Sequence, residues 1–149
     1  MLAQGPTIDG QRSAALRTCT YERCALRIEG NFFGGRSIRT GLEGVAERVG
    51  MLGGGLVRNV GYVPGALMEA EAGRRNAVKA AIAGVIASIA LTTAFTSPYA
   101  STFENNGAGR AWGGLLVGGA AIIVGGVQTI HADRHFSRSV WLFNRDLAR

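Results

Sequence analysis

The chain has 149 residues, a formal net charge of +6 and 17% charged residues, a length typical of one domain. It contains no run of basic residues of the kind that forms a nucleic-acid patch, so we expect no nucleic-acid partner. The charge is unevenly distributed, because residues 80–103 and 111–130 contain no charged side chain. Beside two such apolar stretches, the basic excess favours contact with anionic lipid headgroups.

Residues 1–18 lack the apolar stretch of a signal peptide and are interpreted as an N-terminal extension. Residues 19–52 are predicted to form a small β-containing cytoplasmic module. In this module Leu26 and Ile28 alternate with Arg27 and Glu29, which is the pattern of a half-buried strand. Residues 31–35 have turn chemistry, and residues 37–40 are predicted to form a returning strand.

Residues 42–52 have two interpretations. Their apolar positions have helical spacing, but the glycines among them disfavour a helix, and a third short strand over 45–49 is the alternative. We therefore expect a β-hairpin or a meander whose exposed edges need a partner. Residues 53–76 are predicted to be a Gly-rich linker, beginning Gly53-Gly54-Gly55, followed by a helical entry after a break at Pro64-Gly65. The linker lacks the Lys-Ser/Thr pair of a phosphate-binding loop.

Residues 77–96 and 111–130 are predicted to be two transmembrane helices joined by an external loop, 97–110. Each stretch has 20 residues, which as a helix span roughly 30 Å, the thickness of a bilayer core. A buried helical pair in a soluble protein is the alternative. Each helix carries a stripe of small residues that lets helices approach closely. The stripes are Ala83, Ala87, Ala90 and Ala94 in the first helix, and Gly114, Gly118, Ala121 and Gly125 in the second. They are expected to close the hairpin, with self-association as the alternative.

The fold class predicted is thus a mainly α membrane protein: a two-helix hairpin with a small N-terminal β module and a C-terminal amphipathic helix. Basic residues flank the outer ends of the predicted spans, whereas the loop contains only Arg110. By the positive-inside rule both termini are expected in the cytoplasm of a bacterial inner or intracytoplasmic membrane. These flanking residues are Arg74, Arg75, Lys79, Arg134 and Arg138.

The tail, residues 131–149, has the pattern of a basic amphipathic helix. Phe136, Val140, Phe143 and Leu147 share one face and arginines occupy another. Such a helix is suited to an anionic interface, and the alternative is that it packs on the N-terminal segment. The residues expected at the lipid interface are Arg134, Arg138, Trp141 and Arg145.

Cys19, Cys24, His131 and His135 together have the composition of a Cys₂His₂ zinc site. More than 100 residues separate the two cysteines from the two histidines, whereas the ligands of a structural zinc site are usually close together in sequence. We therefore expect two reduced cysteines and two interfacial histidines, with a metal-dependent regulator as the weakest alternative. No intrinsic cofactor is expected; lipids, or pigments held by partner subunits, are the groups that the chain would contact.

No catalytic constellation is visible. Ser137 and Ser139 lie near His135 in sequence, but a catalytic triad also needs an orienting acid and a cleft. Neither predicted span has an Asp, Glu or His at its centre, so a proton or ion relay is not expected. We expect a protein that is not an enzyme and has no small-molecule substrate.

Two short segments resemble uncharacterised bacterial two-span membrane proteins. The first is residues 24–29, Cys-Ala-Leu-Arg-Ile-Glu, followed by Gly35, Arg39-Thr40-Gly41 and Val49-Gly50, and the second is residues 139–145, Ser-Val-Trp-Leu-Phe-Asn-Arg. The resemblance implies the two-span arrangement and no known activity.

Two functions remain open on these grounds. The first is a non-catalytic structural subunit that stabilises a larger membrane complex, with a photosynthetic or respiratory complex as the expected setting. The second is a stand-alone, self-associating membrane protein that binds anionic lipid through its arginine-rich tail.

Overall fold

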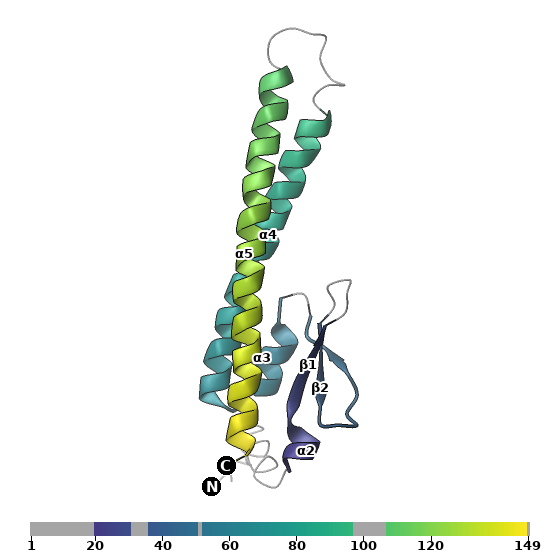
Figure 1. Ribbon diagram of the computed structural model, residues 1–149, viewed down its shortest axis with the longest axis vertical. Helices are drawn as coiled ribbons and strands as arrows, with labels where there is room; N and C mark the ends of the chain where they lie inside the picture. Colours follow the sequence, from purple (N-terminus) through teal and green to yellow (C-terminus); the bar gives the residue numbers. More distant parts are fainter. Residues whose placement is uncertain (1–19, 31–35, 51, 97–106, 149) are drawn as a thin grey trace, which may run out of the picture. The chain divides into compact units, whose positions relative to one another are not determined.

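A computed structural model describes residues 20–30, 36–50, 52–96 and 107–148, and they are mainly helical (Figure 1). The first residues of this set form the short helix α2, Tyr21–Cys24, and a sheet of β1, Leu26–Gly30, β2, Arg36–Thr40, and β3, Glu47–Arg48. Three further helices follow: α3, Gly54–Val60, α4, Pro64–Thr96, and α5, Gly107–Leu147. The chain divides into two compact units. Unit 1 combines the residues up to Arg74 with those from Ala132 onward, and unit 2 comprises Arg75–His131.

The sheet of unit 1 is an antiparallel meander in the order β1-β2-β3, which confirms the expected hairpin or meander. Leu26 pairs with Thr40 and Ile28 with Ile38. Leu26 and Ile38 are buried, while Arg27 is exposed on the opposite face of β1. The helical interpretation of residues 42–52 is wrong, because their described part contains a turn, β3 and loops, with Val45 left almost fully exposed.

The glycines at residues 53–55 begin a helix, which corrects the expected linker. Gly53 has a φ of +75°, a left-handed conformation that favours glycine, and α3 starts at the next residue. Gly55 packs on the backbone of Val49, and its amide donates a hydrogen bond to the Val49 carbonyl at 2.9 Å. The short strand β3 is thereby joined directly to α3.

The core of unit 1 is formed by the sheet, by α3, and by the parts of α4 and α5 that belong to this unit, up to Arg74 and from Ala132. Tyr62 packs edge-on against Phe143, with ring centroids 5.3 Å apart. The larger side chains that are fully buried come from β2, from the residue that follows β3, from α3 and from α5. They are Ile38, Val49, Leu56, Val60, Phe136, Ser139 and Phe143. A small sheet therefore obtains a core by packing on the two long helices.

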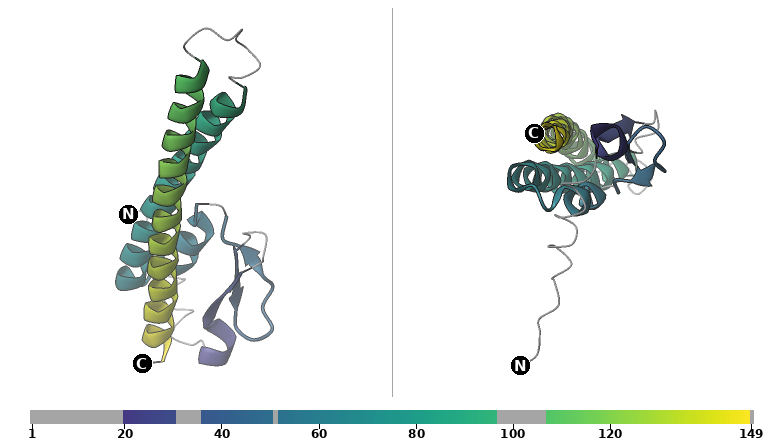
Figure 2. Two further views of the ribbon diagram at one scale, coloured as in Figure 1. Left: turned by 45° about the horizontal axis from the view of Figure 1, so that its top comes forward. Right: turned by 90° about the horizontal axis from the view of Figure 1, so that it is seen from below.

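Helices α4 and α5 are longer than the predicted spans. α4 begins at Pro64, a residue suited to the first turn because its missing N–H has no intrahelical partner there. The expected helical entry and first span are thus one helix, and the expected second span and tail are another. Within unit 2, the segments of α4 and α5 lie side by side (Figure 2).

Both helices are long and apolar enough to cross a membrane, by length and composition. Their most apolar windows are only 17% and 11% buried. A core helix of a soluble protein would be mostly covered, so this exposure disfavours the soluble alternative. Unit 2 instead directs large aliphatic side chains outward, among them Ile82, Ile89, Leu116 and Ile123.

Candidate functional sites

The seam of the hairpin is formed by the predicted stripe of small residues on α4. Ala83, Ala87, Ala90 and Ala94 are 4–8% exposed, although their neighbours on the other faces of α4 are mostly open. A buried row of alanines between exposed Ile and Val residues shows that this face of α4 is covered by protein within unit 2.

The glycine stripe of α5 covers this face. A Cβ atom on Gly114 would lie 2.6 Å from the Ala90 carbonyl oxygen, and one on Gly118 would lie 2.8 Å from Cγ of Leu91. Ala121 is half-buried on the same face, and a Cβ on Gly125 would lie 3.4 Å from that of Ala83. The structure thus places the two stripes against each other, and the helices approach to a distance that a larger side chain would prevent.

Other glycines in unit 2 lie outside the seam. A Cβ added to Gly84, Gly113, Gly119 or Gly126 would meet nothing within 4 Å. Gly118 and Gly119 are adjacent in sequence but lie on different sides of α5. An added Cβ is therefore crowded at Gly118 and unobstructed at Gly119. These glycines therefore lie on outer faces that no part of the described chain covers.

In unit 1, Phe136 of α5 lies between glycines of two other segments. Its ring fills the space beside Gly53, at the start of α3, and a Cβ on Gly73 of α4 would come within 2.6 Å of it. The Arg36 guanidinium lies 5.6 Å from the ring centroid and forms an ion pair with Asp133. This cluster ties the sheet, α3, α4 and α5 together.

Glu69 on α4 forms a second polar cluster with α5. Its Oε2 lies 2.7 Å from Nδ1 of His135, and its Oε1 forms an ion pair with Nε of Arg138 at 3.2 Å. The Glu69 side chain is mostly buried, whereas that of Arg138 is largely exposed. Each carboxylate oxygen contacts a side chain of α5. Glu69 therefore joins α4 to α5 and does not offer a free base.

Asn144 forms a third link within unit 1. Its carboxamide forms two hydrogen bonds with the backbone of Leu26, which is 118 residues away in sequence. Ser139 is buried, and its hydroxyl donates a hydrogen bond to the Ala66 carbonyl at 2.7 Å. Sequence reasoning missed Glu69, Asn144 and Asp133, because no local pattern indicates a partner so distant in the chain.

The residues expected at a lipid interface lie on the exposed side of α5. Arg134, Trp141 and Arg145 are exposed, and the Arg145 guanidinium lies 4.9 Å from the centroid of the Trp141 ring. The opposite side of this segment is buried, with Phe136 and Phe143 in the core of unit 1. The tail therefore packs on the N-terminal module, the second of the two alternatives.

The weak metal candidates are not brought together in the described part of the chain. No group of three or more potential ligands occurs among the described residues. Nδ1 of His135 contacts Glu69, and His131 is exposed. Cys24 is disulfide-bonded, which corrects the expectation of reduced cysteines; Cys19 lies outside the described residues. A disulfide sulfur is not the thiolate that binds zinc.

Comparison with known protein families, curated proteins and solved structures finds no match. The resemblance to two-span bacterial membrane proteins therefore stays a prediction.

Proposed function

We propose that this protein is a non-catalytic accessory subunit of a larger bacterial membrane complex, anchored by the apolar parts of α4 and α5. The observation that carries the proposal is the arrangement of unit 2. The two stripes of small residues lie in the seam between α4 and α5, and the large aliphatic side chains point outward. An outer surface of this kind is stable in lipid or against other apolar helices, and unfavourable in water.

Three features favour a structural role in this membrane setting. Residues 80–96 and 111–130 contain no ionisable side chain, so one copy supplies no proton or ion relay. The polar clusters of Glu69, Ser139 and Asn144 are satisfied by partners inside unit 1. The outward-facing glycines, such as Gly119 and Gly126, would let a neighbouring helix come close. An energy-transducing complex, respiratory or photosynthetic, is the setting that we propose.

A second candidate, a stand-alone protein that binds anionic lipid, is favoured by a separate observation. Arg74, Arg75, Lys79 and Arg134 are exposed and form no ion pair with a described residue. They lie in α4 and α5 within about two turns of the uncharged stretches. Basic residues at such positions attract anionic headgroups.

Purification from native membranes in a mild detergent distinguishes the two candidates. The tagged chain should resist extraction by alkaline carbonate, and it should co-migrate with a large complex on native gels. Gly119→Leu combined with Gly126→Leu should release it from that complex, because a bulky outer face keeps a neighbouring helix away. Gly84→Leu, which also points into open space but from α4, is the matched control. Migration of the wild-type chain as a monomer or a small homo-oligomer would favour the second candidate.

A further inference from the structure

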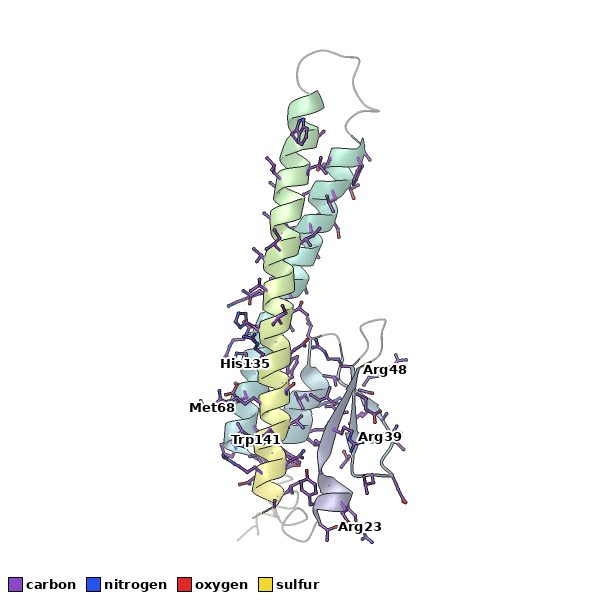
Figure 3. All side chains as sticks on the ribbon, viewed as in Figure 1. Arg23, Arg39, Arg48, Met68, His135 and Trp141 are labelled. Atoms are coloured by element: carbon purple, nitrogen blue, oxygen red, sulfur yellow. The ribbon has the colours of Figure 1, made fainter. Side chains whose placement is uncertain are left out.

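One side of α5 in unit 1 forms an exposed basic and aromatic surface, which we call the Trp141 face. Arg134, Arg138, Trp141 and Arg145 lie at i, i+4, i+7 and i+11, which places them along one side of a helix. Trp141 is 58% exposed. In Figure 3, Met68, His135 and Trp141 lie on the helical side of unit 1, and Arg39 and Arg48 on its sheet side.

The charge of the Trp141 face is only partly neutralised within the molecule. Arg138 pairs with Glu69, but Arg134 and Arg145 are exposed and form no ion pair with a described residue. Arg145 is held over the Trp141 ring, and a guanidinium stacked in this way keeps its N–H donors in a fixed plane. The face therefore presents donors that a carboxylate can bind in a bidentate manner.

The bilayer is not the best occupant of this face. A helix that lies in the membrane interface inserts its apolar side into the lipid. In α5 that side is already used, because Phe136, Ser139 and Phe143 are buried in the core of unit 1. What remains outside is an exposed Trp between arginines, and Trp and Arg are among the residue types most enriched at the energetic centres of protein interfaces.

We infer that the Trp141 face is a docking surface for an acidic segment of a partner protein. This inference rests on the proposed function, since it names the surface by which the accessory subunit is held in its complex. The Trp141 ring would supply the desolvated contact, and Arg134 and Arg145 would bind Asp or Glu side chains of the partner.

Site-specific photo-cross-linking in native membranes tests this inference on the full chain. Benzoylphenylalanine replaces Trp141 in one variant and Arg145 in a second, so that the result does not depend on a single substitution. Benzoylphenylalanine in place of the exposed Arg27, on the sheet of the same unit, is the positional control. The variants at 141 and 145 should link to one protein, at a peptide that contains Asp or Glu, and the control should not.

Charge reversal then tests the chemistry. Arg134→Glu combined with Arg145→Glu, made in the variant that carries the cross-linker at 141, should lower the cross-linking yield roughly tenfold or more. Reversal of the acids in the linked peptide should do the same, and the two reversals together should restore the yield. Arg23→Glu combined with Arg27→Glu is the matched control, since both arginines are exposed in unit 1 and unpaired within the described chain.

Two results would overturn the inference. One is cross-linking to lipid alone, and the other is a protein cross-link that neither charge reversal changes. If the wild-type chain still co-migrates with a large complex in either case, only the inference fails. If the wild-type chain migrates free of any complex, the proposed function fails as well.

Discussion

The side chain of Asn144 takes the place of a neighbouring strand beside Leu26. Its Oδ1 accepts a hydrogen bond from the Leu26 amide at 2.7 Å, and its Nδ2 donates one to the Leu26 carbonyl at 2.9 Å. The Ala25 carbonyl accepts from Gly41 on the β2 side, and backbone groups of successive strand residues point to opposite edges. The groups of Leu26 therefore point to the outer edge of β1, and α5 caps the start of an edge that would otherwise be open.

Asn144→Leu should destabilise unit 1 by about 2 kcal/mol or more, because it leaves two backbone groups of a buried residue without partners. Hydrogen exchange of the Leu26 amide, measured by NMR or mass spectrometry, should become faster. Asn144→Asp is the control, since a carboxylate still accepts from the Leu26 amide but cannot donate to its carbonyl. The Leu26 amide should therefore stay protected in Asn144→Asp. Equal exchange in wild type and Asn144→Leu would contradict this assignment.

Gly73→Ala should destabilise unit 1 by about 1–3 kcal/mol, because the added methyl group would overlap the Phe136 ring. Gly65→Ala on the same helix adds the same methyl group where the nearest atom is Cδ1 of Leu142, at 4.0 Å. It should be neutral or slightly stabilising, since Ala is the better helix former. Thermal unfolding in detergent compares the two variants. Phe136→Leu should relieve part of the Gly73→Ala defect; a strictly additive double variant would refute the overlap.

Gly118→Leu should disrupt the hairpin, whereas Gly119→Leu, one position along, should not. A side chain at Gly118 meets Leu91, while one at Gly119 meets nothing within 4 Å. Overpacking of this kind costs about 1–3 kcal/mol, which should appear as a lower thermal midpoint for Gly118→Leu in purified, detergent-solubilised protein. If the two variants melt alike, the seam is not where the structure places it.

Glu69→Ala should weaken the attachment of α5 to α4 in unit 1, because His135 and Arg138 both lose their partner. Hydrogen bonds with a charged partner are worth about 1.5–3 kcal/mol, and the exposure of Arg138 reduces this value through solvent screening. Glu69→Gln keeps one acceptor oxygen and should fall between Glu69→Ala and wild type. Limited proteolysis and chemical unfolding report the order. A Glu69→Gln variant less stable than Glu69→Ala would exclude this link between α4 and α5.

For the proposed membrane protein, two features predict opposite sides of the membrane for unit 1. Basic residues beside the uncharged stretches favour a cytoplasmic location, whereas disulfides such as that of Cys24 persist mainly in oxidising compartments. We expect the basic residues to decide, because they act during insertion. A fluorescent protein fused after Arg149 should be bright, and alkaline phosphatase fused there should be inactive. The opposite pair of results would place unit 1 outside the cytoplasm.

The sequence by itself determined the elements that depend on local pattern. Uncharged stretches at 80–96 and 111–130 specified two long apolar helices, because their length and composition leave few alternatives. The alternation around Leu26 specified β1, because the period of two is a property of the strand itself. The small-residue stripes were equally visible, since helical spacing places them on one face.

Only the tertiary structure decided how the ends of these helices are used. The tail pattern fitted a lipid surface and a protein core equally well, because an apolar face does not identify what covers it. In the structure the tail packs on a protein core. Phe136 fits between Gly53 and Gly73, and Asn144 forms hydrogen bonds with the backbone of Leu26. These partners lie far apart in the chain, so no local signal predicts them. Gly53 was expected in a linker, but it lies in a left-handed conformation directly before α3. The ring of the buried Phe136 packs against it there.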